Sequence, residues 1–182
     1  MATTTPSAGP ATAPDFALDG TDGRRHRLAE LRGQKATLVM FLCNHCPYVK
    51  AVLDDLIAEV RELQPLGVGA VAIMPNDTEA YPEDAFENMQ RLARAKDFPF
   101  PYLIDRTQAV ARAYGAVCTP DFFGFDAALN LAYRGRLYDV RNLKRVPGAR
   151  RELFEAMAAI ARGGAAPAEQ HPGIGCSIKW RD

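Results

Sequence analysis

Two cysteines stand where a buried strand is predicted to give way to a helix, and this junction constrains the fold of the chain more than any other feature. The apolar run 36–42 has the length of a buried strand. Cys43 and Cys46 follow it as a Cys-x-x-Cys pair, and from Pro47 the apolar residues recur at helical spacing. Because a helix N-terminus carries unpaired N–H groups and about half a positive charge, it stabilises a thiolate. The junction therefore predicts a redox-active dithiol.

The segments on either side of the junction predict an α/β domain. Pro65 and Gly67 end the helix, and a second apolar strand follows over residues 68–74. Strand, helix and strand should form a parallel, right-handed unit. The remaining pattern predicts a hairpin over 14–28, a helix over 83–96, a strand over 102–104, a helix over 105–114 opened by Asp105 and Gln108 as a capping box, a hairpin over 121–133, and a helix over 149–161.

Charge and composition exclude several classes of protein. The 22 basic and 22 acidic residues of the 182-residue chain cancel, so we expect neither a nucleic-acid partner nor a membrane partner. No segment has the ~20 apolar residues that cross a bilayer, and the first 14 residues lack the features of a secretory signal. We therefore expect a cytoplasmic protein whose four cysteines serve chemistry rather than a structural disulfide framework.

The order of these elements resembles the thioredoxin fold. Thr119 and Pro120 stand just before the second hairpin, where that fold places a cis-proline facing the dithiol. The chain over residues 13–182 is similar to peroxiredoxin-like proteins related to the AhpC/TSA family. The segments that carry this resemblance are 13–33, Cys43-Asn44-His45-Cys46-Pro47-Tyr48-Val49, Tyr81-Pro82-Glu83-Asp84, Cys118-Thr119-Pro120-Asp121-Phe122-Phe123 and Gly175-Cys176-Ser177-Ile178-Lys179-Trp180.

The resemblance implies a three-layer α/β/α sandwich with a mixed central sheet, an additional N-terminal hairpin and a C-terminal tail. We expect a disordered leader over residues 1–13, one thioredoxin-like domain over 14–162, and a tail over 163–182 that docks on this domain. The implied chemistry is thiol redox exchange, for which no cofactor and no metal are expected. The partners would be disulfides or thiols of proteins or small molecules, together with a cellular thiol reductant.

The dithiol residues receive specific roles from the sequence. Cys43, at the strand end, is predicted to be the exposed attacking thiolate, and Cys46, one helical turn further, the resolving thiol. A protonated His45 would favour the thiolate. Asn44 and His45, together with the Thr119-Pro120 loop, are predicted to bind the substrate, because an extended loop before a cis-proline can pair with a substrate segment.

Several alternatives remain open at this stage. A thiol peroxidase with antioxidant activity is the second hypothesis, but the Thr that typical peroxiredoxins place three residues before the reactive cysteine is Met40 or Cys43 here. Thioredoxins also place a buried acid six residues before the first cysteine, where this chain has Thr37. A soft-metal site would need ligands beyond one Cys-x-x-Cys pair, and a non-catalytic binding module is the last alternative. Cys118 and Cys176 are interpreted either as core residues or as further redox thiols.

Overall fold

A mixed seven-stranded sheet forms the centre of the protein in the computed structural model, which describes residues 1–181. Its strands are β2 (Ala17–Gly20), β3 (Arg25–Arg27), β4 (Ala36–Phe41), β5 (Val68–Met74), β6 (Tyr102–Ile104), β8 (Asp121–Asp126) and β9 (Leu131–Arg134). They lie in the order β3-β2-β6-β5-β4-β8-β9. Strand β4 pairs in parallel with β5 and antiparallel with β8, so the strand that leads to the two cysteines lies inside the sheet.

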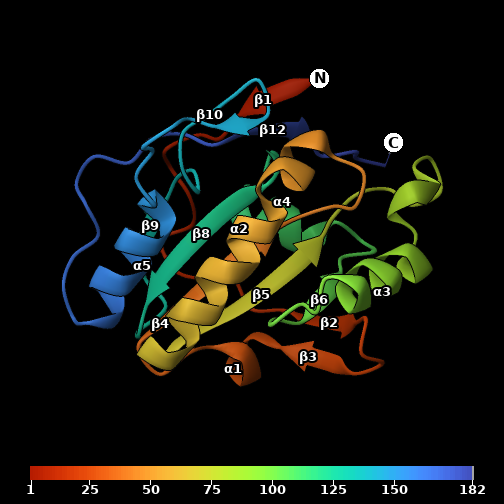
Figure 1. The fold of residues 1–182 in the computed structure, drawn as a ribbon. Helices are drawn as coiled ribbons and strands as arrows, with labels where there is room; N and C mark the ends of the chain where they lie inside the picture. The colour runs from red at the N-terminus through yellow and green to blue at the C-terminus, as the bar shows by residue number, and fades with distance from the viewer. Residues whose placement is uncertain (182) are drawn as a thin grey trace.

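Helices cover both faces of this sheet. On one face α2 (Pro47–Leu63), α3 (Phe86–Ala95) and α5 (Glu152–Ala161) contribute to one apolar cluster, and α2 and α5 cross in front of the strands in Figure 1. On the other face α1 (Leu28–Leu31) and α4 (Ala109–Tyr114) contribute to a second cluster. This confirms the predicted three-layer α/β/α sandwich with a mixed sheet and an N-terminal hairpin.

Strand β4 shows why the apolar run was continuous rather than alternating. Leu38 and Met40 pack in the cluster under α2, whereas Val39 and Phe41 point to the opposite cluster. Successive side chains of a strand face opposite sides of the sheet, and here each side is covered by helices. All six residues of β4 are buried, which fixes the position of the loop that follows it.

A second, three-stranded sheet joins the two ends of the chain beside the first turn of α2. It consists of β1 (Ala2–Thr4), β12 (Ile174–Ser177) and β7 (Cys118–Thr119), with β12 in the middle. Figure 1 shows β1 and β12 together at the upper edge of the molecule. The predicted tail extends to residue 182, which lies outside the described residues.

The first residues differ from the prediction of a disordered leader. Strand β1 pairs antiparallel with β12, and Thr5 is buried next to Gly173, whose N–H donates to the Thr5 hydroxyl over 2.8 Å. A local bridge also joins Thr12 to Asn130. The leader has few apolar residues, so its composition did not indicate an ordered segment; its order comes from backbone pairing with residues about 170 positions away, which local patterns do not show.

The predicted capping box is wrong. Helix α4 begins at Ala109, and Gln108 before it has a left-handed backbone (φ 61°) without a side-chain cap. Asp105 instead accepts a hydrogen bond from the backbone N–H of Ala111 over 2.8 Å. Gln108 turns away from the helix and donates to the carbonyl groups of Pro75 and Lys179. Asp105 therefore still accepts from the first turn of the helix, whereas Gln108 makes long-range contacts instead of completing the box; Gly115 (φ 65°) ends the helix as expected.

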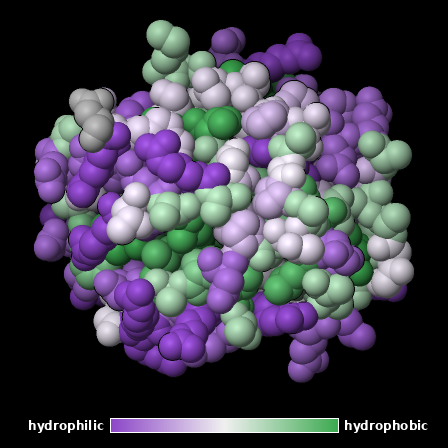
Figure 2. Space-filling view, turned by 180° about the vertical axis from the view of Figure 1, so that it is seen from behind, coloured by the Kyte–Doolittle hydropathy of each residue, from purple (hydrophilic) through white to green (hydrophobic). Residues whose placement is uncertain are grey.

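The remaining short elements complete the chain: the 3₁₀ helices η1 (Gln64–Leu66) and η2 (Pro82–Asp84), and the small hairpin of β10 (Val140–Arg141) and β11 (Lys144–Arg145). Among the described residues no helix is long and apolar enough to span a bilayer. The rear face in Figure 2 carries separate hydrophobic patches between hydrophilic ones.

Candidate active site

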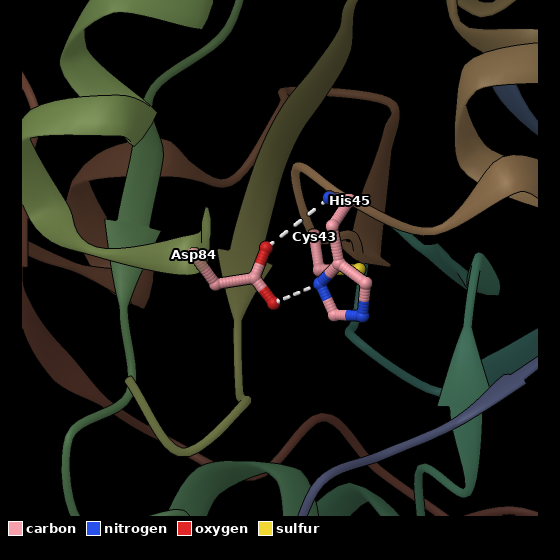
Figure 3. A group of neighbouring side chains, drawn as sticks. All are labelled: Cys43, His45 and Asp84. Atoms are coloured by element: carbon pink, nitrogen blue, oxygen red, sulfur yellow. Dashed lines mark hydrogen bonds and ion pairs between the residues drawn. The ribbon is translucent and has the colours of Figure 1, made fainter. Parts of the chain in front are cut away.

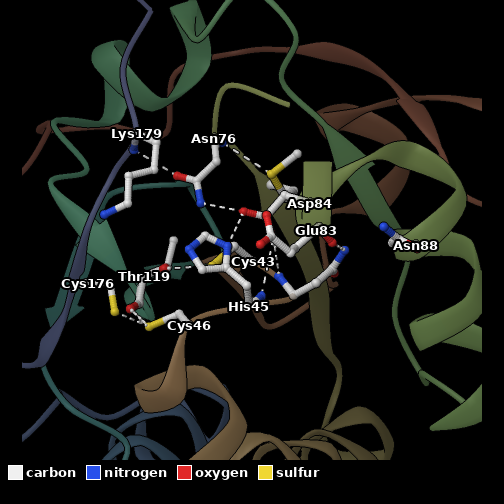
Figure 4. Close-up of polar contacts among 12 residues, drawn as sticks. Cys43, His45, Cys46, Asn76, Glu83, Asp84, Asn88, Thr119, Cys176 and Lys179 are labelled. Carbon is white, nitrogen blue, oxygen red and sulfur yellow. Dashed lines mark hydrogen bonds and ion pairs between the residues drawn. The ribbon is translucent and has the colours of Figure 1, made fainter. Parts of the chain in front are cut away.

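Cys46 is the N-cap residue of α2, and its sulfur contacts the strands β7 and β12. Its Sγ lies 3.1 Å from the carbonyl oxygen of Thr119 in β7 and 2.8 Å from the Sγ of Cys176 in β12 (Figure 4). Cys43 lies next to it, between the end of β4 and the helix, and its Sγ is 3.2 Å from the Thr119 hydroxyl. Three thiols and one threonine thus form a single cluster.

This placement corrects two premises of the sequence interpretation. Cys46 does not lie one turn inside the helix but is its N-cap residue, with an extended backbone (φ −63°, ψ 123°). Cys43 is not exposed, because only 1% of its surface is accessible to solvent. Cys46 is equally buried, with 0% accessible. The helix begins later than the Cys-x-x-Cys pattern suggested, since Pro47 suits the first helical position and not the position before it.

The Thr119-Pro120 loop before the second hairpin lies beside the two cysteines, as predicted from the sequence. The Thr119–Pro120 peptide bond is cis, as predicted, and Thr119 is buried against both cysteines. Pro120 lines an apolar cavity of about 60 Å³ together with Tyr48 at the start of α2 and Ile174 of β12. The structure therefore brings together Cys43, Cys46 and the Thr119-Pro120 loop.

The environment makes Cys46 the most acidic of the three thiols. The ionised Cys46 sulfur accepts a hydrogen bond from Cys43 and a further one from Cys176, and these lower the pKa of Cys46 to about 5 against the opposing effect of burial. Donating to Cys46 raises the pKa of Cys43, as do burial and the negative charge of Asp84. Burial, followed by the hydrogen bond to Cys46, raises the pKa of Cys176 to about 11. The negative charge is therefore stabilised on Cys46, between two protonated neighbours.

Asp84 of η2 is the acid that sequence reasoning missed. Its side chain is fully buried and accepts four hydrogen bonds, three of them from the loop between the cysteines; Figure 3 shows the two that come from His45. The donors are the backbone N–H groups of Asn44 (2.7 Å) and His45 (3.3 Å), the Nδ1 of His45 (2.6 Å) and the amide of Asn76 (2.8 Å).

The position at which thioredoxins place a buried acid is occupied here by Thr37, inside β4. Here the carboxylate comes from a different element, 40 residues further along the chain than Asn44. The Tyr81-Pro82-Glu83-Asp84 segment did carry part of the family resemblance, and this was the one signal that could have indicated it. Its contact with the dithiol loop depends on how η2 folds back on the sheet.

Asn44 holds the loop in place through both ends of its amide. Its Nδ2 donates to the carbonyl oxygen of Glu83 over 3.1 Å, and its Oδ1 accepts a hydrogen bond from the hydroxyl group of Tyr102 over 3.0 Å. Tyr102 belongs to β6, so the loop is tied to the sheet and to η2 at once. The amide that sequence reasoning assigned to substrate binding therefore already has partners within the protein.

His45 forms the exposed rim of the cluster. Its side chain is 24% accessible, and its ring stacks on Tyr81 with 5.7 Å between centroids and 9° between planes. The buried carboxylate of Asp84 balances the charge of a protonated ring, so an imidazolium here contributes less to a thiolate than an unpaired one would. His45 thus lies beside the thiols, as predicted, with a partner that the sequence did not indicate.

One group of side chains has the donor types of a metal site. The Sγ of Cys43, a ring nitrogen of His45 and a carboxylate oxygen of Asp84 all lie within 4.8 Å of one another (Figure 3). Sulfur, imidazole and carboxylate donors suit Zn²⁺. The four hydrogen bonds to Asp84 use the same atoms, however, so a metal ion would have to replace the proton between Asp84 and His45.

The two remaining cysteines differ in their contacts. Cys118 is fully buried in β7, where its Sγ lies 3.6 Å from the carbonyl oxygen of Pro120, and burial raises its pKa. Cys176 is partly exposed and touches Cys46. The sequence treated these cysteines alike, whereas the structure places only Cys176 within the thiol cluster.

Comparison with known proteins agrees with this description. The match to the AhpC/TSA family covers residues 11–134, which is more than half of the chain. The chain belongs to the AhpC/TSA family. The matched residues end with β9, so helix α5 and strand β12, which carries Cys176, lie beyond the matched part.

Individual relatives of this AhpC/TSA protein fall into two groups. Two crystal structures are similar over almost their whole length. One is of an uncharacterized conserved protein from Geobacillus kaustophilus, with 44% identity and a TM-score of 0.94 over 100% of this chain and 97% of that one. The other is of a hypothetical protein from Sinorhizobium meliloti 1021, with 36% identity and a TM-score of 0.90 over 98% of this chain and 97% of that one. The thiol-disulfide oxidoreductase ResA of Geobacillus thermodenitrificans is 30% identical over 117 residues, 63% of this chain. The match spans 62% of ResA, less than two thirds of its length.

Proposed function

We propose that this protein is a thiol-disulfide oxidoreductase in which the Cys46 thiolate attacks a disulfide. The observation that carries the proposal is the cluster around Cys46: an N-cap sulfur that lies beside Cys43 and Cys176, whose hydrogen bonds lower its pKa. A thiolate is the attacking species in disulfide exchange. Similarity to ResA supports the same class of reaction.

The first step leaves a mixed disulfide on the protein. The Sγ of Cys46 attacks one sulfur of the substrate disulfide R–S–S–R, the bond between Cys46 and RS forms, and the S–S bond of the substrate breaks to release RS⁻. A second protein thiol then attacks Cys46 and releases the other RSH. The protein gives up two electrons in total and ends with one internal disulfide, while the substrate becomes two thiols.

This proposal exchanges the roles that sequence reasoning assigned to the pair. Cys43 was expected to attack and Cys46 to resolve, but Cys43 lies beside the buried Asp84 and its pKa is raised. A negative charge on Cys43 would be repelled by the carboxylate. Cys46 has no such neighbour among its contacts, and the N-terminus of α2 adds a favourable field.

Substrate contacts follow from which of the site residues are accessible. His45 and Tyr81 form the exposed rim, and we assign to them the first contact with the substrate. Asn44, Thr119 and Pro120 shape the floor, where Thr119 keeps both sulfurs in position. Because Cys46 has no exposed surface, a small side-chain movement precedes the attack, and a compact disulfide suits the site better than a bulky one.

The proposal is tested by mixing the fully reduced protein with a small aromatic disulfide such as 5,5′-dithiobis(2-nitrobenzoate) and following thiolate release over a single turnover. The fast phase should be lost in Cys46→Ser and retained in Cys43→Ser. Trapped adducts located by peptide mass spectrometry should lie on Cys46. A fast phase that survives in Cys46→Ser and disappears in Cys43→Ser would restore the opposite assignment.

A thiol peroxidase is the second candidate function. Membership in the AhpC/TSA family favours it, and so does the enclosed sulfur of Cys46, which a hydrogen peroxide molecule reaches more easily than a large disulfide. The residue three places before Cys46 is Cys43, not the Thr of typical peroxiredoxins. Rapid consumption of hydrogen peroxide with a thiol reductant, faster than reduction of small disulfides under the same conditions, would place the peroxidase first.

A further inference from the structure

Strand β12 fills the edge of β7 that sequence reasoning had assigned to a substrate segment. It pairs antiparallel with β7, with Cys176 opposite Thr119 and Ser177 opposite Cys118. The residues just before the cis-proline are therefore already paired with the chain's own C-terminal strand. At the position where a substrate cysteine would meet Cys46, the protein presents Cys176 (Figure 4).

We propose that Cys176 is the resolving thiol of the enzyme and that the catalytic cycle closes an intramolecular Cys46–Cys176 disulfide. This inference rests on the proposed function, because it concerns the second step of the exchange that Cys46 begins. It adds a third cysteine to the two of the Cys-x-x-Cys motif. Cys43 then remains a thiol that donates a hydrogen bond to Cys46.

The distance between the two sulfurs supports a direct bond. Their separation of 2.8 Å must shorten by less than about 1 Å to reach the length of a disulfide, roughly 2.05 Å. Antiparallel pairing of Cys176 with Thr119 holds its backbone next to the carbonyl group that contacts Cys46. The bond can therefore form without a rearrangement of the sheet.

Backbone contacts fix the residues that follow Cys176 along the chain. The N–H of Ser177 donates to the carbonyl oxygen of Met1 over 3.0 Å, and the N–H of Ile178 donates to that of Val117 over 3.0 Å. Further along, the carbonyl oxygen of Lys179 accepts hydrogen bonds from Asp77 and from Gln108. A thiol held in this way has a high effective concentration toward Cys46.

Charge also favours Cys176 over Cys43 as the second nucleophile. A resolving thiol must lose its proton as it attacks, and Cys43 would do so beside the buried carboxylate of Asp84. Cys176 faces the positive charges of Lys179 and of the N-terminal amino group, both of which lower its pKa against the effect of burial. Cys176 is also partly exposed, whereas Cys43 is closed off from solvent.

The step is balanced in atoms and electrons. The Cys176 sulfur attacks the Cys46 sulfur of the mixed disulfide, the Cys46–Cys176 bond forms, and the bond between Cys46 and the substrate sulfur breaks. The proton of Cys176 goes to the leaving substrate sulfur, which departs as a thiol. Both cysteines are oxidised, and the substrate is reduced by the same two electrons.

The experiment uses the full-length reduced protein and one equivalent of 5,5′-dithiobis(2-nitrobenzoate). Release of the first thionitrobenzoate reports attack by Cys46, and release of the second reports resolution. In Cys176→Ser the second release should slow by about tenfold or more, because an intramolecular attack of high effective concentration is lost. In Cys118→Ala, which changes a cysteine outside the cluster, the second release should stay fast, and non-reducing peptide mapping of the wild-type protein should find Cys46 joined to Cys176.

A matched control moves the thiol by one residue. In the double variant Cys176→Ser/Ser177→Cys the number of thiols is unchanged, but successive side chains of a strand face opposite sides, so resolution should remain slow. The proposal is overturned if Cys176→Ser resolves at the wild-type rate, or if Cys43→Ser alone traps the mixed disulfide. Loss of the first release in wild-type protein, or its persistence in Cys46→Ser, would instead count against the proposed function.

Discussion

Cys43 and Cys176 both flank Cys46, yet they belong to very different regions of the molecule. Cys43 lies three residues before Cys46, is closed off from solvent and has the buried Asp84 carboxylate close by. Cys176 comes from 130 residues further along the chain, is partly exposed and lies near Lys179. The comparison teaches that sequence proximity to a reactive cysteine does not identify its partner, because the charge around each thiol decides whether it can ionise.

Replacing the central sulfur should have the largest effect. In Cys46→Ser the first release of thiolate from a small disulfide should fall by about 30-fold or more, because a thiol of ordinary pKa is only roughly 3% ionised at pH 7. Stopped-flow absorbance at pH 7 measures this rate, and circular dichroism of the variant controls for its fold. Loss of less than about threefold would mean that a different cysteine attacks.

Removing the negative charge of Asp84 should reduce the difference in pKa between Cys43 and Cys176. Asp84→Asn keeps the shape of the side chain, but an amide cannot accept all four hydrogen bonds that the carboxylate accepts. The free energy of unfolding should therefore fall by about 1–3 kcal/mol. The pKa of Cys43 should also fall, because the repelling carboxylate is gone.

Chemical denaturation measures the first effect of Asp84→Asn, and the pH dependence of Cys43 alkylation measures the second. Glu83→Gln is a suitable control, since its side chain is a neighbouring, more exposed carboxylate. If Cys43 reacts equally in both variants, the buried charge is not what suppresses it.

The prediction from sequence was good where local pattern and packing agree. The strand over 36–42 and the helix after Pro47 follow from apolar periodicity, and β4 and α2 form as expected. The cis bond at Thr119-Pro120 followed from the fold that the element order resembled. These features depend on residues close to one another in the chain or on a shared topology.

What could not be predicted depends on contacts between distant segments. Asp84 reaches the dithiol loop only because η2 folds back on it, and β1 is ordered only because β12 lies next to it. Cys176 meets Cys46 through the pairing of β12 with β7. No periodicity marks such contacts, and therefore the three-thiol cluster emerged only in three dimensions.

The stability of the reduced protein should depend on pH through Cys46. Its pKa is lowered from 9.0 to about 5 in the folded state, so between these values the unfolded chain binds one more proton at this site than the folded protein does. The contribution of Cys46 to stability should therefore rise from pH 5 toward pH 9 and be lost as the pH falls through 5. Comparing unfolding of wild-type and Cys46→Ser proteins at pH 5 and pH 8 checks this; a difference that shrinks with rising pH would contradict it.

Removing the Cys176 side chain, which covers the Cys46 sulfur, should have the smallest effect on the rate of the first attack. Cys176→Ala removes a sulfur that lies 2.8 Å from Cys46 and should raise the rate of the first attack about twofold to fivefold, by increasing the fraction of molecules open to the substrate. The same variant should lose the fast second release. Cys118→Ala, a buried cysteine of β7 outside the cluster, serves as the control and should change neither step.

The most direct measurement is the identity of the thiolate itself. Reduced wild-type protein is labelled at pH 6 with less than one equivalent of iodoacetamide, and the modified cysteine is located by peptide mass spectrometry. The account predicts the label on Cys46, with a pH dependence of labelling whose midpoint lies well below that of an ordinary thiol. A label found mainly on Cys43 or Cys176, or a Cys46 midpoint near that of an ordinary thiol, would contradict it.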